Sequence, residues 1–551
     1  MDRRASIVLL AVLGAGVFLA GLELMITAVA LPSILTDLVA TDGTTAWAGL
    51  RKASWIVNGY LLVYVLVMPL AGRLADLWGA RRLFLGALAI FTIGSALAGA
   101  AQDLDQLIVA RLVQAVGGGI LVPVGTAGAA HLFGGDGRAR ALGVIGALTF
   151  LGMAAGPFLG AAILGSVHPE DALIGAGLGG TVAMDLLTPA WRWIFYVNVP
   201  IGIVAMVLAW AAAPDWETPR RPGRVDIPGA LLFGIALAAG LLALTLLGLE
   251  RVAGSDVDPA VLTAVLVVLA VVATAAAIVR ALRSDDPFLD VRLFRSVPFS
   301  SAALVSALTG YAFATAIIGG AVFVDRVLYG GPDEQRLALG ALAGATAIGA
   351  LAAGFLVRLA GFRLVTLAGL GLAIVGLLVM ARWTPETDIT SVAGGLALFG
   401  FGFGLSVTPR SAAAVEAAGT RAFGAASSVV TVARMIGMAV GLAILTAYGS
   451  TTIDRLTLQI TGSPEAYLEV IPEELRDRPL RDPLVVEALE AWASREAASI
   501  MVGLFFVAAV VTVAAVPPGL ALGGRTHGSS ARVVTPGMLP GDGPTEPDLI
   551  L

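Results

Sequence analysis

The stretch GRLADLWGARR, residues 72–82, separates two apolar runs at residues 54–71 and 83–101. Each run has about the length that a helix needs to cross a hydrocarbon layer, which is roughly 20 residues. The stretch between them leaves room only for a turn, and its glycines permit a tight one. This part of the chain therefore predicts two membrane-spanning helices joined by a short charged turn.

The composition is that of a chain surrounded by lipid. Hydrophobic residues make up 58% of the 551 residues and charged residues 13%, about half of the roughly 25% that is typical of soluble domains. This excludes a large soluble enzyme, and a net charge of −5 offers no basic surface to nucleic acid. Cysteine is absent, and the only lysine is Lys52. Thiolate metal sites and phosphate-binding loops ending in Gly-Lys are therefore excluded, and we expect neither a metal nor a cofactor.

Further apolar runs of spanning length follow along the whole chain, separated by charged or turn residues. The fourteen runs lie at residues 7–31, 54–71, 83–101, 105–129, 139–165, 191–213, 227–249, 259–282, 297–323, 337–357, 364–382, 389–409, 423–449 and 498–521. Strands of a membrane barrel would instead alternate in segments of about ten residues. The sequence predicts an all-α integral membrane protein with fourteen transmembrane helices.

The arginines set the orientation of these spans. With both ends in the cytosol, twenty of the 34 Lys and Arg residues fall in inside segments, Arg410 among them, and twelve fall outside. Five of those twelve lie in the long segment 450–497, where the positive-inside rule is weak. Arg111 and Arg434 fall within spans. We therefore expect a multi-pass protein of the cell inner (plasma) membrane with both termini cytoplasmic.

The spans divide the chain into two similar halves. The expected units are an N-terminal six-helix bundle at 1–213, a linker with two extra helices at 214–296, a C-terminal six-helix bundle at 297–522 and a disordered cytoplasmic tail at 523–551. The stretch Gly72–Arg81 has an echo in Gly354–Arg363, and both stretches lie between the second and third spans of their half. Parallel repeats of this kind place the substrate between the halves, near the middle of the membrane.

The charged turn resembles the signature of the major facilitator superfamily, and within it that of the fourteen-helix drug:proton antiporters. The matching residues are Gly72, Arg73, Leu74, Ala75, Asp76, Gly79, Arg81 and Arg82. The resemblance implies two six-helix bundles plus two extra central helices. It also implies a conformational latch in which Asp76 meets a helix N-terminus or an arginine. The alternative is a basic loop that only fixes orientation.

Two further spans carry motifs of that branch. Arg111, Gln114, Gly117 and Pro123 resemble R-x-x-Q-G-x-G, although Ala115 stands where the family usually has glycine. The resemblance gives Arg111 a supporting role in proton relay, and the alternative is an arginine that snorkels to the outer interface. Gly143, Gly152, Gly156, Pro157 and Gly160 resemble the antiporter motif, with Ala161 in place of its last glycine. The motif implies export by exchange, but a packing face of glycines bent by proline explains the same residues.

The acidic residue of the first span is the candidate proton carrier. Leu22–Pro32 and Trp191–Pro200 resemble hallmarks of the fourteen-helix branch, with Glu23 in the place of an aspartate and Ala28 in that of an asparagine. A carboxylate in the membrane interior can load and release a proton as its exposure alternates. We expect Arg434, near the membrane midplane, to pair with Glu23 across the halves. The alternative is a carboxylate permanently paired with an arginine for packing.

Polar side chains within the spans are the candidates for a central cavity. They are Asn58, Tyr60, Gln114 and Tyr311, next to Glu23, Arg111 and Arg434. The pattern of segment 450–497 indicates amphipathic helices that extend the last two spans. This makes the chain similar also to the mycobacterial triacylglyceride-exporting pump of the same branch, although that pump has an acidic residue where this chain has Phe150.

The resemblance implies a proton-coupled antiporter that exports hydrophobic or amphiphilic small molecules by alternating access, with the proton gradient as its energy source. Its expected partners are that cargo, protons and the bilayer, and an extracytoplasmic accessory protein is a further candidate. The alternative is an exporter of lipids such as triacylglycerides to the outer cell envelope. An enzyme would need a catalytic cluster of acids, histidines or metal ligands, and a channel would need pore-lining rings. The sequence predicts neither.

Overall fold

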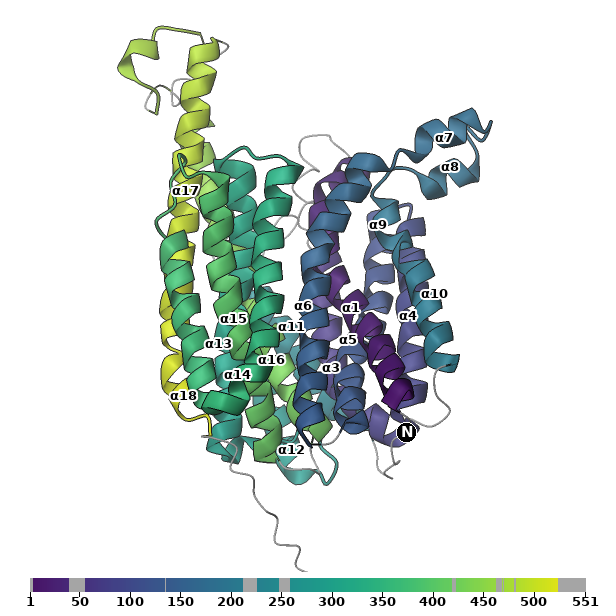
Figure 1. Ribbon diagram of the computed structural model, residues 1–551. Helices are drawn as coiled ribbons and strands as arrows, with labels where there is room; N and C mark the ends of the chain where they lie inside the picture. Colours follow the sequence, from purple (N-terminus) through teal and green to yellow (C-terminus); the bar gives the residue numbers. More distant parts are fainter. Residues whose placement is uncertain are drawn as a thin grey trace, which may run out of the picture.

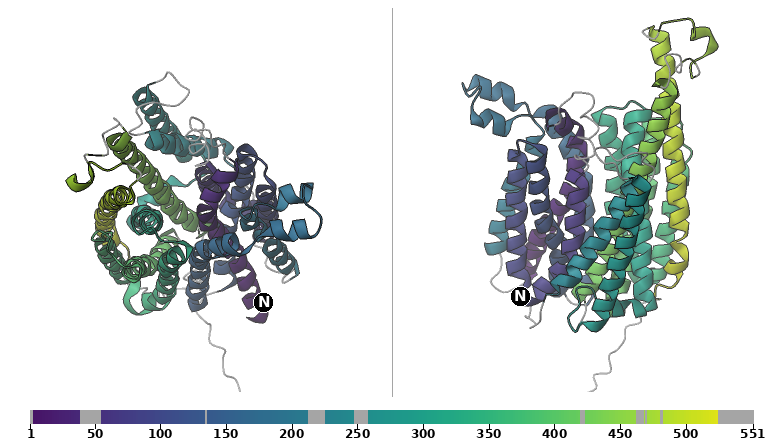
Figure 2. Two further views of the ribbon diagram at one scale, coloured as in Figure 1. Left: turned by 90° about the horizontal axis from the view of Figure 1, so that it is seen from above. Right: turned by 180° about the vertical axis from the view of Figure 1, so that it is seen from behind.

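The computed structural model describes residues 3–523 except 39–54, 134, 212–224, 247–257, 419–422, 462–467, 469 and 480–481. Throughout these residues the chain is built of helices that stand side by side in two neighbouring groups (Figures 1 and 2). Thirteen helices of the described part are long and apolar enough to cross a membrane. The expected all-helical membrane architecture is confirmed.

The first group holds the helices of the N-terminal half. They are α1 (Arg3–Leu38), α3 (Trp55–Trp78), α4 (Ala80–Ala100), α5 (Leu104–Leu132), α6 (Gly135–Ser166), α9 (Arg192–Tyr196) and α10 (Asn198–Ala211). Two short helices, α7 (Pro169–Gly175) and α8 (Val182–Leu187), lie between α6 and α9. They project sideways at the end of the molecule opposite the N-terminus (Figure 1).

The second group holds the C-terminal half. It comprises α13 (Val297–Val322), η2 (Phe323–Val327), α14 (Pro332–Met380), α15 (Ile389–Ala418), α16 (Phe423–Thr461), α17 (Pro483–Val513) and α18 (Val516–Leu520). The short turns η1 (Val291–Arg295) and η4 (Glu473–Leu475) precede α13 and α17. α16 and α17 continue beyond the bundle at the end opposite the N-terminus (Figure 1). The predicted helical extension of the last two spans is therefore present in the described residues.

The helix α14 accounts for the difference between thirteen helices and fourteen predicted spans. Its 49 residues would reach about 74 Å at 1.5 Å per residue, more than twice a hydrocarbon core of about 30 Å. A kink at Gly361, with φ of 79°, divides it. In the first half Gly79, with φ of 87°, separates α3 from α4. The sequence echo thus marks one backbone turn that occurs in both halves, and only glycine adopts it without strain.

Glycines also bring the first and fifth spans of each half into contact in the same way. A Cβ on Gly152 of α6 would overlap the carbonyl oxygen of Phe18 on α1, and one on Gly437 of α16 would overlap that of Ala307 on α13. One turn later, Gly156 and Gly441 again meet the backbone of α1 and α13. Small residues at this spacing let helix backbones approach closely in lipid. The two halves therefore share one packing plan.

The two extra helices lie at the seam between the halves. They are α11 (Ile227–Leu246) and α12 (Pro259–Arg283), close to the predicted limits. α11 packs against α3 of the first half and α16 of the second, and α12 packs mainly on α11. Much of α12 is apolar and exposed, with Val268 at 61% and Val271 at 63%, as expected of a helix that faces lipid. The seam they cover is visible from behind (Figure 2).

Candidate functional site

Glu23 is fully enclosed by protein in the first half. It lies on α1 and is 0% exposed. The part of α1 around it packs on the glycine face of α6. Gly21 of α1 meets the backbone of Thr149, and Gly156 of α6 meets Leu22 and Ile26 on either side of Glu23. The residues of the predicted antiporter motif therefore hold the backbone that carries this acid.

Three side chains donate hydrogen bonds to the Glu23 carboxylate. Arg111 of α5 forms an ion pair with Oε1, and Thr27 Oγ1 donates to the same oxygen at 3.0 Å. Asn198 Nδ2 of α10 donates to Oε2 at 2.6 Å. Both carboxylate oxygens are thus occupied, which is what a buried charge requires.

Arg111 is as deeply buried as its partner. It is 1% exposed, its NH1 also donates to Gln114 Oε1 at 2.6 Å, and its Nε donates to the Ile56 carbonyl at 3.4 Å. The guanidinium carbon lies 4.1 Å from the centre of the Tyr60 ring. Arg111 therefore points into the bundle and does not snorkel to an interface, so that alternative is wrong.

A second tier of hydrogen bonds fixes the groups around the ion pair. Gln114 Nε2 donates to Ser95 Oγ at 3.0 Å, and Asn198 Nδ2 lies 3.1 Å from the same oxygen. Ser95 in turn donates to the Phe195 carbonyl at 2.9 Å. Four helices, α1, α4, α5 and α10, thereby converge on one carboxylate.

The charge of Glu23 contributes to the contact between α1 and α5. A proton on Glu23 would remove the negative charge and leave Arg111 with neutral acceptors only, namely Gln114 and the Ile56 carbonyl. Because charge-assisted hydrogen bonds are roughly twice as strong as neutral ones, protonation weakens the attachment of α1 to α5. The site is therefore suited to reversible proton binding that changes the contact between helices.

Asn198, Ser95 and Thr27 were missed as site residues by the sequence argument. Asn198 stands in the recognised stretch Trp191–Pro200, and an amide inside an apolar span is itself a signal. The start of that stretch anchors α9 and α10: Trp191 Nε1 donates to Asp37 at 3.0 Å, and Arg192 donates to the carbonyls of Gly99 and Ala101. These bonds bring the first residue of α10 to Glu23.

The four cavity candidates have different surroundings. Gln114 and Tyr60 belong to the Glu23 cluster, and the Tyr60 ring lies against Arg111. Within the described residues, half-buried Asn58 makes no hydrogen bond to the cluster. Tyr311 is 7% exposed and lies on α13, where its backbone meets Gly441. Only Gln114 and Tyr60 therefore contribute to this site.

Arg434 and Glu23 are not paired in this structure, contrary to expectation. Glu23 has Arg111 as its partner within the first half, whereas the Arg434 guanidinium lies 5.4 Å from the centre of the Phe150 ring on α6. Arg434 still reaches across to the other half, but its neighbour there is an aromatic face and not a carboxylate. A favourable cation–π contact replaces the expected ion pair.

On sequence Arg410 falls just beyond the end of a span, whereas the structure has it inside a helix. α15 continues to Ala418, so Arg410 lies well within the helix and is 1% exposed. The apolar run ends at this residue in the sequence because its charge lowers the local hydropathy. In the structure Thr309 of α13 accepts a hydrogen bond from it, and the Phe403 ring covers it at 5.3 Å.

The predicted latch residues connect three parts of the molecule. Arg73 pairs with Asp286, before α13, at 2.7 Å, and Arg81 donates to the Trp210 carbonyl near the end of α10 at 3.2 Å. Gly79 supplies the turn, Gly72 is half-buried and Arg82 is exposed. The side chain of Asp76 lies outside the described part of the structure.

Some glycines of the antiporter motif contact the neighbouring helix α1, and one has free space beside it. Gly152 and Gly156 meet α1, Pro157 lies inside α6, and Gly160 is buried. A Cβ on Gly143 would meet nothing within 4 Å. The packing interpretation therefore holds for the middle of the motif and not for its start.

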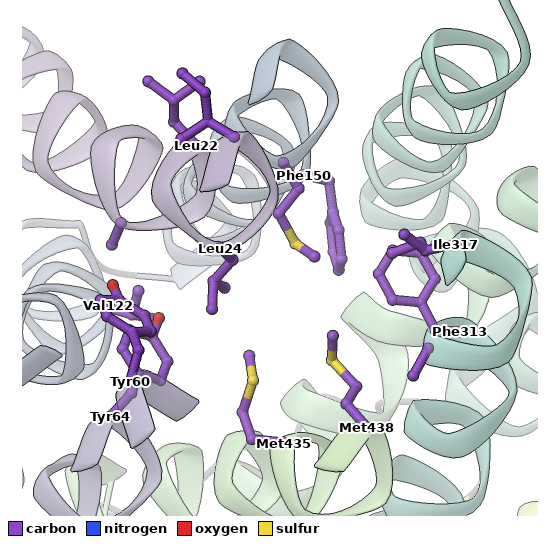
Figure 3. Packing of buried hydrophobic residues seen from close by; sticks show 14 of the residues in the cluster. Leu22, Leu24, Tyr60, Tyr64, Val122, Phe150, Phe313, Ile317, Met435 and Met438 are labelled. Carbon is purple, nitrogen blue, oxygen red and sulfur yellow. The ribbon is translucent and has the colours of Figure 1, made fainter. Parts of the chain in front are cut away.

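Apolar side chains from both halves face one another between the bundles. Leu24, Tyr60, Phe150, Phe313 and Met435 come from five different helices and point toward a common region (Figure 3). All five are at most 7% exposed. Phe150 of α6 lies 6.0 Å from Phe313 and contacts the second half through its ring edge. The facing surfaces of the two bundles are therefore lined by hydrocarbon and aromatic rings.

Two helical bundles related by a repeat, with a buried charged cluster, define a membrane transporter. The sequence profile of the Major Facilitator Superfamily matches residues 13–442, and the chain belongs to that superfamily.

Similar proteins include both lipid and drug transporters. A triacylglyceride transporter of Mycolicibacterium hassiacum is 33% identical over 79% of this chain and 78% of its own length. One of Mycobacterium tuberculosis is 31% identical over 86% and 88%, and multidrug resistance protein 3 of Bacillus subtilis is 27% identical over 78% and 77%.

Solved structures agree on the fold. A bacterial homologue of the human lysosomal transporter Spinster, in an inward-facing and unoccupied conformation, has a TM-score of 0.58 at 17% identity, covering 94% of this chain and 98% of that one. A proton:xylose symporter of the superfamily has a TM-score of 0.54 at 12% identity, covering 94% and 97%.

Proposed function

We propose that the chain is a proton-coupled antiporter that exports hydrophobic or amphiphilic small molecules across the cytoplasmic membrane by alternating access. The observation that carries the proposal is the buried Glu23–Arg111 pair at the contact of α1, α5 and α10. Glu23 takes up a proton when the first half opens to the outside and releases it to the cytosol. The antiporter motif of α6 and the multidrug resistance relative support this direction of transport.

The steps follow from the contacts of Glu23. Protonation frees α1 from Arg111, and the helices that share the cluster can then shift against α6 along the glycine face. Deprotonation restores the ion pair and returns α1 to α5. Cargo moves between the bundles along the apolar lining, because that surface holds greasy molecules without demanding a particular shape. The proton gradient is the only energy source in this scheme.

The test is transport by inverted vesicles under an imposed proton gradient. Glu23→Gln keeps the size and shape of the side chain but removes the titrating group, and we expect it to abolish gradient-driven movement of a lipophilic dye. Glu416→Gln is the matched control, because Glu416 is exposed near the end of α15. Undiminished gradient-driven transport by Glu23→Gln would refute the carrier role.

Export of triacylglycerides is a second candidate function. The triacylglyceride transporters among the relatives favour it, and so do α16 and α17, which extend beyond the bundle where a lipid would leave the bilayer (Figure 1). Transport of a fluorescent triacylglyceride in the same vesicles decides between export of small molecules and export of lipid. Movement of lipid without movement of dye would establish lipid as the cargo.

A further inference from the structure

Arg410 is a buried cation that does not use all of its hydrogen-bond donors. It is 1% exposed on α15 and donates to Thr309. Its NH2 group has no acceptor within the described residues. The Phe403 ring covers one face of the guanidinium. A hydroxyl and a ring are neutral, so nothing described here balances its charge.

Arg434 is a second cation beside the first. It lies on α16, half-buried, with its Nε unpaired among the described groups. Its guanidinium carbon lies 5.4 Å from the centre of the Phe150 ring. That ring is in edge contact with the Phe403 ring that covers Arg410, with 5.7 Å between the two ring centres. By helical rise, Arg434 is about 16 Å from the start of α16 and Arg410 about 12 Å from the end of α15, so both lie at similar depth.

Neither arginine has an acidic partner in the described part of the chain. The ion pairs formed there involve other arginines, including Arg111, Arg192 and Arg280. Two like charges that lie against neighbouring rings inside the bundle repel each other, and burial removes water from them. The chemical group that would relieve both effects is an anion.

The surface next to these cations is apolar. Met438 lies one helical turn from Arg434 on the same face of α16, because residues four apart in a helix are neighbours. Met435, Phe313 and Ile317 lie near Met438 and belong to the same apolar cluster (Figure 3). Methionines adapt to ligands of varied shape. A charged end and an apolar end are therefore adjacent in the second half.

We propose that Arg410 and Arg434 bind the carboxylate or phosphate head of an anionic amphiphile whose hydrocarbon chain lies along Met435, Met438 and Phe313. The site rests on the proposed function, since it names a class of cargo for the same transporter. Arg434 is the half-buried member of the pair and meets the head first. Arg410 completes the charge neutralisation with its unpaired NH2.

The test is equilibrium binding to the full chain in phosphatidylcholine nanodiscs without any gradient. Laurate, dodecyl phosphate and dodecanol share a chain and differ in the head, whereas acetate has the head alone. We expect both anionic probes to bind at least about tenfold more tightly than dodecanol, and acetate to bind weakly. Equal affinity of laurate and dodecanol would overturn the charged site, and acetate as tight as laurate would overturn the amphiphile.

Substitutions test the two arginines separately. Arg434→Gln and Arg410→Gln should each weaken laurate binding by about tenfold and leave dodecanol unchanged. Exposed Arg382→Gln is the control. Arg410→Gln could disturb folding because Arg410 is fully buried. Arg434 loses only a ring contact, so Arg434→Gln is the decisive variant. Unchanged laurate affinity in Arg434→Gln refutes the site.

The two possible sources of the anion are separated by competition. If phosphatidylglycerol added to the nanodiscs displaces laurate, the head belongs to a membrane lipid, and if it does not, the ligand is a free amphiphile. Both results support the site. Because no gradient is applied, failure of the Glu23→Gln transport test leaves this binding result standing, and failure of binding leaves proton coupling standing.

Discussion

Asn198 of α10 connects Glu23 on α1 with Ser95 on α4. Its Nδ2 donates to Glu23 and also lies near Ser95 of α4, while its Oδ1 has no partner among the described groups. The amide therefore has a spare acceptor next to the acid. Nδ2 donates to the ionised carboxylate, and Oδ1 is an acceptor of the kind that a protonated carboxyl group needs.

Replacing Asn198 with alanine should weaken proton-driven transport. The variant removes a hydrogen bond to a charged group, worth about 1.5–3 kcal/mol, and we expect gradient-driven dye transport to fall about tenfold. Transport rates in vesicles at two external pH values measure this. Asn58→Ala on α3 is the control, because half-buried Asn58 makes no described bond to the cluster. Equal losses in the two variants would contradict a specific role for Asn198.

The sequence located Glu23, Arg111 and Gln114 but not their geometry. Each lies in a recognisable motif, so all three could be named without coordinates. Whether Glu23 pairs with Arg111 or Arg434 depends on which helices approach, and that is decided by glycine contacts between segments far apart in the chain. Arg410 escaped notice for a related reason: a charge at the end of an apolar run looks like a loop until its helix is seen to continue.

Asp226 connects the start of α11, the end of α12 and the segment that follows α12. It accepts hydrogen bonds from Arg280 at the end of α12 at 2.6 Å, from the amide of Gly229 in α11 at 3.0 Å and from the amide of Phe288 at 3.2 Å. Burial works against its ionisation, but these donors outweigh that effect and hold the pKa of Asp226 below the ordinary value of 3.8. The ends of the two extra helices are thus joined by a carboxylate that stays charged.

We expect Asp226→Asn to lower the thermal stability of the full chain in a pH-dependent way. The unfolded chain binds the proton more readily, so the contribution of Asp226 is complete above pH 3.8 and is lost as the pH falls through the folded pKa. Because Arg280 is 42% exposed, solvent screening limits the effect to about 1 kcal/mol.

Melting curves of the two proteins should differ at neutral pH and converge below pH 3.8. Asp285→Asn, an exposed acid in the neighbouring loop, should show no such gap. A difference for Asp226→Asn that grows on acidification would show that the folded pKa is raised and not lowered.

The helix α6 offers a matched pair of glycines within one motif. Gly152 faces the backbone of α1, whereas Gly143, also buried, has open space where a Cβ would be. An added methyl group at Gly152 must separate α1 from α6 or bend one of them, because backbone atoms cannot rotate away. The same group at Gly143 meets no such obstacle.

Gly152→Ala should therefore destabilise the chain by about 1–3 kcal/mol and impair transport, while Gly143→Ala should do neither. Melting temperature in detergent and dye transport in vesicles are the two measurements. If both variants behave alike, the motif acts through something other than contact with α1. Gly437→Ala extends the test, since Gly437 has the same contact in the second half and should be equally sensitive.

The two halves share a backbone plan and differ in charge. The paired turns at Gly79 and Gly361 and the paired contacts of Gly152 and Gly437 show the common plan. The first half buries an acid with its own arginine, whereas the second half buries two arginines without an acid in the described part. Phe150 of the first half reaches these arginines: its ring contacts Arg434, and also Phe403 with 5.7 Å between ring centres. The first half therefore offers an aromatic ring, and not an acid, to Arg434.

Placing an acid at residue 150 should supply the anion that the second half lacks. In Phe150→Glu the new carboxylate can reach Arg434, whose guanidinium carbon is 5.4 Å from the centre of the present ring. The resulting ion pair joins the halves and competes with the head group of any anionic ligand, so laurate affinity should fall about tenfold while dodecanol affinity stays the same. Phe150→Gln has the same shape without the charge and should retain laurate binding. A loss of laurate binding in both variants would mean that the ring itself, and not the free charge of Arg434, holds the ligand.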